Sequence, residues 1–105
     1  MPIITNDPEI VTQINVFTVS DGQQQSLVDH LAGAARAARE VDGWLSASLH
    51  CSLDGTRVVN YAQSADRDAA ARVIAHLKRT GWIDANRRFG EAHPGLYRVA
   101  FTLER

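Results

Sequence analysis

The sequence predicts a single α+β domain with the element order β-α-β-β-α-β. Its 105 residues are enough for one domain with a single hydrophobic core. Its composition, 45% hydrophobic and 22% charged, is typical of a folded globular protein. Segments with the two-residue period of a strand alternate with segments that repeat at helical spacing. An Asp-Gly pair between two strand-like runs indicates an antiparallel hairpin. This order is that of the ferredoxin-like fold, with a four-stranded antiparallel sheet.

The first strand is expected within residues 10–19, where Ile14, Val16 and Thr18 alternate with residues of the other face. Residues 1–8 have no such pattern and are interpreted as a flexible arm, so the domain is expected to comprise residues 9–105. A helix should follow, capped by Asp21 and ended by a left-handed Gly43. Its apolar stripe, about five turns long, consists of Leu27, Leu31, Ala34, Ala38 and Val41.

The hairpin is expected to join residues 44–53 to residues 56–63 through Asp54-Gly55. A three-residue loop would pair Ser48 with Asn60 and His50 with Val58, which places the even-numbered residues on one face. The opposite face would then be apolar and would need cover from a second copy of the chain. We therefore expect a homodimer that buries the odd-numbered Leu49, Cys51, Val59 and Tyr61.

The second helix is expected over residues 65–80, with Ser64 as its N-cap and Gly81 at its end. A short helix over residues 82–89 and a turn at residues 93–95 should precede a last strand over residues 96–103. Three aromatic side chains are expected to fill the core near the second helix, namely Trp82, Phe89 and Tyr97. An aromatic such as Trp82 would also suit a cavity for a polycyclic ligand.

Charge and cysteine content argue against several classes of function. A formal net charge of −1 provides no basic field for nucleic acid or for an anionic membrane surface. The single cysteine, Cys51, allows no internal disulfide, and no segment has the features of a signal peptide or a membrane span, so the cytoplasm is expected. The four histidines, at positions 30, 50, 76 and 93, are not spaced as metal ligands, so no metal site is expected.

Three segments carry a resemblance to a known family: GWLSASLH at residues 43–50, SLDGT at residues 52–56 and VVNYAQ at residues 58–63. They resemble the antibiotic biosynthesis monooxygenase family, in its branch of small oxygenases from aromatic polyketide pathways. The resemblance implies a dimeric α/β barrel that oxidises an anthrone-type phenol to a quinone with O₂. It also implies that neither a metal nor a flavin takes part, so no cofactor is expected.

The resemblance also implies site residues. Asn60 matches an Asn of the family's third strand, and His50 matches a His of the second strand. Ser64 stands where the family has a Trp, and Ala70 lies near a position that often holds a Tyr. An Arg after the second helix corresponds to Arg87 or Arg88.

The roles expected of these residues follow from their chemistry. The Asn60 amide would donate to a carbonyl or peroxide oxygen as negative charge develops there. His50 would accept the substrate proton, a role for which an imidazole side chain is suited. Ser48 and Ser64 are expected to bind the substrate, and in an alternative without O₂ these small polar residues would shape the pocket together with Ser46. Purely structural roles remain open: Asn60 could bond a neighbouring side chain, and His50 could be a hydrogen-bonded core or rim histidine.

Two alternative functions remain open. The same cavity could bind a polyketide for cyclisation, isomerisation or transport without O₂. A haem-binding or haem-degrading relative is the second alternative, with Asn15 on the first strand and His76 on the second helix as the expected site residues.

Overall fold

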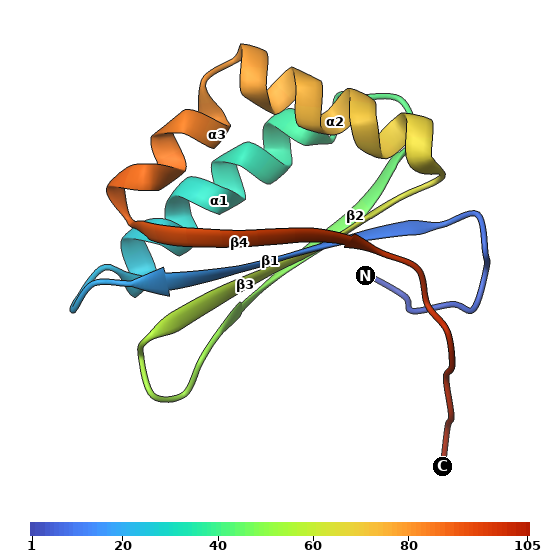
Figure 1. Ribbon diagram of the computed structural model, residues 1–105, viewed down its shortest axis with the longest axis horizontal. Helices are drawn as coiled ribbons and strands as arrows, with labels where there is room; N and C mark the ends of the chain where they lie inside the picture. Colours follow the sequence, from blue (N-terminus) through green and yellow to red (C-terminus); the bar gives the residue numbers. More distant parts are fainter.

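Four strands form one antiparallel sheet, and the helices connect them (Figure 1). The computed structural model describes all residues from 1 to 105. In chain order the elements are β1 (Val11–Val19), α1 (Gln24–Ala38), β2 (Trp44–Cys51), β3 (Arg57–Ser64), α2 (Arg67–Arg79), α3 (Trp82–Ala85), the 3-10 turn η1 (Asn86–Arg88) and β4 (Gly90–Tyr97).

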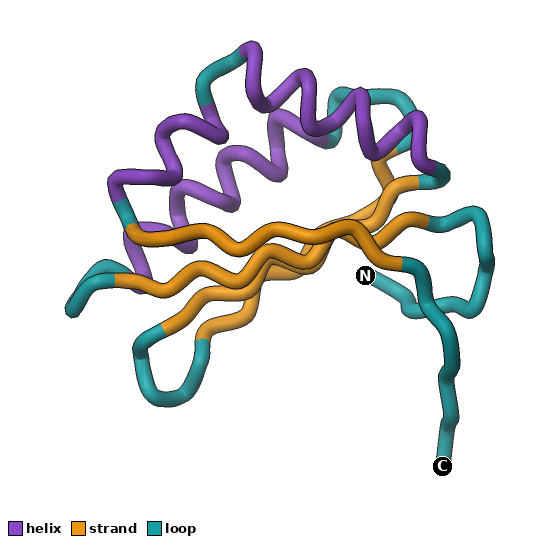
Figure 2. The backbone as a smooth tube through the Cα atoms, in the orientation of Figure 1, coloured by secondary structure: helices purple, strands orange, loops and turns teal.

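The molecule has two layers, a sheet of order β2-β3-β1-β4 and a layer of helices on one of its faces (Figure 2). The other face carries no helix, and residues 98–105 extend away from the domain as a tail without regular structure. The predicted ferredoxin-like arrangement is therefore confirmed. No helix has both the length and the apolar character needed to cross a membrane.

The core lies between β1, β3 and α1. Phe17, Leu27 and Val58 are fully buried there, and Leu31 joins them. Because strand residues alternate between faces, the burial of Phe17 identifies the odd-numbered residues of β1 as facing the helices. Its partner in the β1–β3 ladder is Val58, so the even-numbered residues of β3 face the helices as well.

Gly43 forms the turn between α1 and β2, as predicted. Its φ of +91° lies in the left-handed region, and a Cβ built on it would lie 2.5 Å from the Cβ of Ala69 in α2. Only glycine combines this backbone conformation with such close packing. The Gly43 carbonyl also accepts a hydrogen bond from the Ala65 amide at 2.8 Å, which ties the end of β3 to this turn.

The predicted hairpin register is wrong by one residue. The Ser52 amide donates to the Arg57 carbonyl at 3.0 Å, so the loop has four residues, 53–56, instead of three. Ser48 therefore pairs with Tyr61, and His50 pairs with Val59 instead of Val58. Because side chains alternate along a strand, this shift moves the residues of β2 to the opposite face relative to β3.

Two of the four residues predicted to form the apolar dimer face, Leu49 and Cys51, consequently lie on the other face of the sheet. Leu49 pairs with Asn60 and packs against the core on the helical side, and Cys51 pairs with Val58. Val59 and Tyr61 lie on the face without helices, which we call the open face. The β1 residues that share the open face with them are Ile14 and Val16.

The last strand also differs from the prediction. β4 runs over Gly90–Tyr97 and includes the His93-Pro94-Gly95 sequence that was expected to form a turn. β4 is an edge strand that pairs only with β1, and such a strand tolerates a proline that lacks an N–H donor. Tyr97 is 53% exposed and does not belong to the core.

Both predicted helix caps are wrong. The N-cap of α1 is Gln23, whose side chain makes no capping bond, and the helix ends at Ala38 instead of Val41. The N-cap of α2 is Asp66, whose carboxylate accepts from the Ala69 amide at 2.8 Å. Ser64 is the last residue of β3, where it pairs with β1, so it cannot begin the helix.

Candidate active site

A cavity of about 820 Å³ lies between the sheet and the helical layer. It falls within the range of sites that enclose drug-sized ligands, roughly 300–1,000 Å³. The strands supply Gln13, Asn15, Phe17, Asn60, Gly90, Glu91, Ala92 and Pro94, and the helical layer supplies Leu31, Ala34, Ile74, Leu77, Lys78, Trp82, Ile83, Asp84, Asn86 and Arg87.

Two asparagines lie side by side on the sheet wall of this cavity. Asn15 and Asn60 are direct partners in the β1–β3 ladder, so their side chains project from neighbouring strands in the same direction. Asn15 is only 9% exposed, and its Oδ1 has no hydrogen-bond partner. Buried amides in proteins are normally bonded, so an unpartnered one that lines a cavity is available to a ligand.

The cavity wall opposite the sheet includes the indole of Trp82. His30 of α1 contacts it: the two ring centroids are 5.2 Å apart, and His30 Nε2 lies 3.3 Å from the Trp82 carbonyl oxygen. The indole also packs directly on the α1 backbone, because a Cβ on Gly33 would lie 2.7 Å from its Cη2 atom. Trp82 was expected in the core, but it lies on the cavity wall instead.

Charged side chains of both signs also line the cavity. Lys78 and Arg87 are cationic, Asp84 and Glu91 are anionic, and all four residues are exposed. The apolar part of the lining includes Phe17 and Leu31 from the core, and the helical layer adds Ile74, Leu77, Trp82 and Ile83. The cavity therefore combines an apolar interior with polar amides on its sheet wall and charges at its solvent-exposed part.

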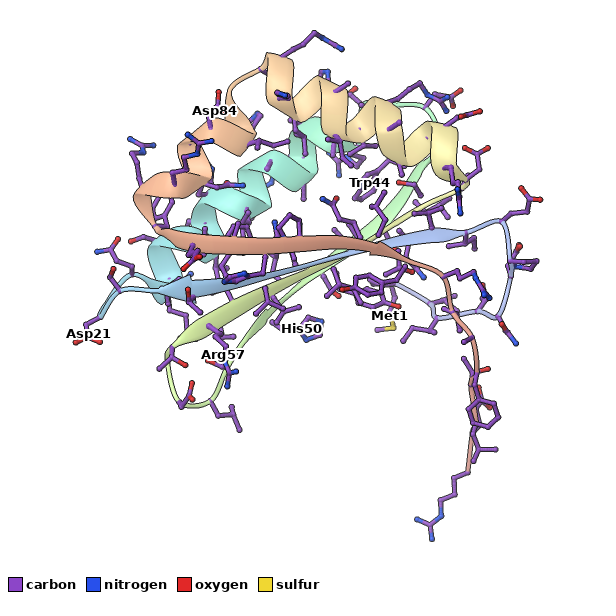
Figure 3. All side chains as sticks on the ribbon, viewed as in Figure 1. Met1, Asp21, Trp44, His50, Arg57 and Asp84 are labelled. Atoms are coloured by element: carbon purple, nitrogen blue, oxygen red, sulfur yellow. The ribbon has the colours of Figure 1, made fainter.

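His50 does not share the cavity with Asn60. It lies on the open face, where its Nε2 is 3.0 Å from the Ser48 hydroxyl oxygen (Figure 3). The prediction that the two serve one site within a protomer is wrong, because the sheet separates them. Ser48 lies on the open face for the same reason.

Ser64 and Arg88 also lie outside the cavity lining. Ser64 is buried at the end of β3, where it pairs with Val11 and with Trp44. Arg88 is exposed, with its guanidinium carbon 5.7 Å from the centroid of the Phe89 ring. Arg87 and Arg88 were both candidates for the family's arginine after the second helix, and Arg87 is the one that lines the cavity.

Two asparagines of the cavity, Asn15 and Asn86, were not predicted from the sequence to belong to an oxygenase site. Asn15 was expected as a site residue only in the haem alternative. It interrupts a strand rich in β-branched residues, as Asn60 does, and this pattern in the sequence could have identified it. Asn86 lies in a short helical turn with no periodic pattern, so no comparable signal marks it. His76, the other residue of the haem alternative, lies outside the cavity lining.

The family model described as antibiotic biosynthesis monooxygenase matches residues 10–88. The chain belongs to this family. Among curated proteins of the family's kind, the tetracenomycin-F1 monooxygenase of Streptomyces glaucescens is 42% identical over 64 residues, which is 60% of this chain and 57% of that protein. The match thus spans a little more than half the length of that relative.

Two solved structures support the antibiotic biosynthesis monooxygenase fold over nearly the whole chain. SnoaB, a cofactor-independent oxygenase from Streptomyces nogalater, has a TM-score of 0.81 at 26% identity, with 92% of this chain and 99% of that chain covered. The monooxygenase ActVA-Orf6 of Streptomyces coelicolor, solved with the ligand Nanaomycin D, has a TM-score of 0.79 at 29% identity, with 95% and 96% covered.

Proposed function

We propose that this protein is a cofactor-independent monooxygenase that oxidises an aromatic polyketide of anthrone type to a quinone with O₂. The observation that carries the proposal is the cavity itself, with Asn15 and Asn60 side by side on one wall and Trp82 on the other. Family membership supports it, as do relatives named tetracenomycin-F1 monooxygenase and cofactor-independent oxygenase.

The reaction converts a methylene group and O₂ into a carbonyl group and water. The methylene group of an anthrone is acidic, because loss of one of its protons leaves a carbanion that is delocalised over the rings and the carbonyl group. This carbanion transfers one electron to O₂, and the resulting radical pair combines to a carbon-bound peroxide. Loss of the second hydrogen with cleavage of the O–O bond gives the carbonyl group and releases water. One oxygen atom enters the product and the other enters water.

Asn15 and Asn60 act on the charge that develops during this sequence. Their N–H groups donate to the substrate carbonyl oxygen as the carbanion forms and then to the peroxide. Fixed donors in a cavity with apolar walls stabilise such charge more strongly than water does, because they need no reorganisation. Phe17, Leu31 and Trp82 provide the apolar surface around the rings.

The substrate proton leaves to water at the exposed part of the cavity. His50 was expected to accept it, but His50 lies across the sheet from Asn60. The anthrone-type substrate can ionise with water as the only proton acceptor, because the N–H donors of Asn15 and Asn60 stabilise its anion.

We further propose that the protein is a homodimer that works in the cytoplasm. The open face carries Ile14, Val16, Val59 and Tyr61, which form an apolar surface that a second copy would bury. A reducing compartment suits a chain whose one cysteine, Cys51, is a free and exposed thiol.

The proposal is tested by incubating the EDTA-treated protein with an anthrone, with and without O₂. We expect quinone absorbance to rise only with O₂, and O₂ to be consumed in equal amount. Asn60→Ala and Asn15→Ala should each lower turnover by about 10²-fold, because each removes a donor to the developing charge. Their melting temperatures should stay close to that of the parent, since neither side chain fills the core cluster.

Asn6→Ala is the matched control, since Asn6 is an exposed residue of the N-terminal segment. It should leave turnover unchanged. Anthrone bound without any O₂ consumption would favour the alternative of a non-redox polyketide-binding protein. A Soret band on titration with haemin would favour the haem-binding alternative instead. Either result would contradict the oxygenase proposal.

A further inference from the structure

Asn86 is a cavity residue whose side chain has no partner in the protein. It begins η1, in the segment that descends from the end of α2 to the start of β4 (Figure 1). The residue lines the cavity, and its Oδ1 atom is buried without a hydrogen bond. An unpartnered buried amide oxygen is destabilising, so its presence calls for an explanation.

The local backbone does not supply that explanation. The turn at Asn86 is held by main-chain hydrogen bonds: its amide donates to the carbonyls of Ile83 and Asp84, and its carbonyl accepts from the Phe89 amide at 3.1 Å. The carboxamide contributes to none of these bonds. The carboxamide is therefore free to bond a ligand, and of its two polar atoms Oδ1 is the one that is buried without a partner.

The position of Asn86 relative to the other amides defines what it can bind. Asn15 and Asn60 project from the sheet, whereas Asn86 projects from the helical layer, and all three line one cavity. A flat ligand between the two layers is thus flanked by amides from both. The sheet amides face the reacting oxygen, so Asn86 is left for another part of the ring system.

We propose that Asn86 is a substrate-binding residue whose Oδ1 accepts a hydrogen bond from a hydroxyl group on an outer ring of the substrate. The substrate class is accordingly a fused-ring aromatic with a peripheral O–H group. The inference rests on the proposed function in taking a flat aromatic molecule as the ligand and in placing its reacting oxygen at the sheet amides. A neutral amide oxygen requires a donor, which a hydroxyl provides and a carbonyl or an ether does not.

The neighbouring charges explain why the bound group is neutral. Arg87, the next residue, and Lys78 also line the cavity and would attract an ionised group to themselves. An amide binds a neutral hydroxyl without the desolvation cost of a charge. Asn86 therefore selects the protonated phenol group.

The test is a binding measurement with two quinones that differ only in peripheral hydroxyls, 2,6-dihydroxyanthraquinone and anthraquinone. Quinones are at the oxidation level of the product, so no turnover takes place. Tryptophan fluorescence is followed at a pH that keeps both hydroxyls protonated. We expect Asn86→Ala to weaken binding of the dihydroxy compound about tenfold and to leave binding of anthraquinone unchanged.

Asn86→Asp keeps an acceptor oxygen and should stay within about threefold of the parent for the dihydroxy compound. Arg88→Ala is the local control, because Arg88 is in the same turn but outside the cavity lining. It should change neither affinity.

Three results would overturn the inference: an equal loss for both quinones on Asn86→Ala, no loss for either, or no binding of the dihydroxy compound to the parent protein. A loss with Asn86→Asp as large as with Asn86→Ala would also overturn it, since the amide nitrogen would then be the binding atom. Selective binding without any O₂-dependent turnover of an anthrone would uphold this inference and contradict the proposed function.

Discussion

Asn15 and Asn60 show how single residues define this site. Asparagine is depleted in strand interiors, and both residues interrupt strands that are otherwise rich in β-branched and apolar residues. Their pairing in the ladder places two amides at one point of the cavity, which neither residue would achieve alone. The unpartnered oxygen of Asn15 lowers the stability of the free protein, because it leaves a buried acceptor without a donor.

Asp54 is the residue whose titration should be visible in stability. Its Oδ1 accepts from the Thr56 hydroxyl at 2.7 Å, from the Thr56 amide at 3.1 Å and from the Ser52 hydroxyl at 2.8 Å. These bonds, with the more distant Arg57, hold the pKa of Asp54 at about 2, below its ordinary 3.8. The folded state therefore favours the ionised carboxylate, and the stabilisation is complete above the ordinary pKa.

We expect Asp54→Ala to lower the melting temperature at neutral pH, because it removes the bonds that hold the β2–β3 loop. The difference between variant and parent should shrink as the pH falls from about 4 to about 2, since the parent carboxylate then becomes protonated as well. Thermal unfolding across this range measures the difference. A difference that stays constant with pH would show that the bonds do not depend on the charge of Asp54.

At the scale of elements, the segment α3–η1 forms much of the helical wall of the cavity. It is held against α1 through the rings of His30, Trp82 and Phe89, with centroid distances of 5.2 and 5.1 Å from His30. Gly33 allows the indole of Trp82 to lie on the backbone of α1. The position of this wall therefore depends on the absence of a side chain at Gly33.

Gly33→Ala tests this dependence. Alanine favours the helix by about 1 kcal/mol relative to glycine, but its Cβ would lie 2.7 Å from Cη2 of Trp82, so the indole must move. We expect a small change in melting temperature together with a clear loss of affinity for 2,6-dihydroxyanthraquinone, measured by titration. Unchanged affinity would show that the wall tolerates a displaced indole.

At the scale of the whole molecule, helices cover only one face of the sheet. Val16, Val59 and Tyr61 are half-buried on the open face of the single chain, and the tail beyond β4 exposes Phe101 and Leu103. An antiparallel sheet with an apolar face is stable when a second layer covers it. The proposed second layer is the sheet of another copy.

We expect sedimentation of the parent protein to show a dimer at micromolar concentration, with a total buried area of roughly 2,000 Å² or more. Val59→Asp should produce a monomer or an unfolded chain, because it places an unpaired charge in the contact. Ala71→Asp is the matched control, since Ala71 is exposed on α2, and it should remain dimeric. A parent protein that sediments as a monomer would refute the dimer.

The order of the elements could be predicted because it depends on local signals. Two-residue alternation in β1, the apolar stripe of α1 and the left-handed Gly43 each involve neighbours in sequence, and each was found where expected within a few residues. The family segment over residues 43–63 lies in one such local unit, the β2–β3 hairpin.

The register of that hairpin and the extent of β4 were decided only by the tertiary structure. A loop of three or four residues is compatible with the same Asp-Gly pair, but the difference of one residue sends His50 and Asn60 to opposite faces. Likewise, residues 93–95 contain the Pro-Gly pair of a turn, yet pairing with β1 makes them an edge strand.

The candidate site was therefore predicted only in part. Asn60 and Arg87 line the cavity as expected from the sequence, and Trp82 lines it instead of filling the core. Asn15 and Asn86 join them from distant positions in the chain. The local pattern of a chain determines which segments are strands and helices. Which side chains meet in a cavity depends on strand register and on the packing of layers, and these are settled by contacts between residues far apart in sequence.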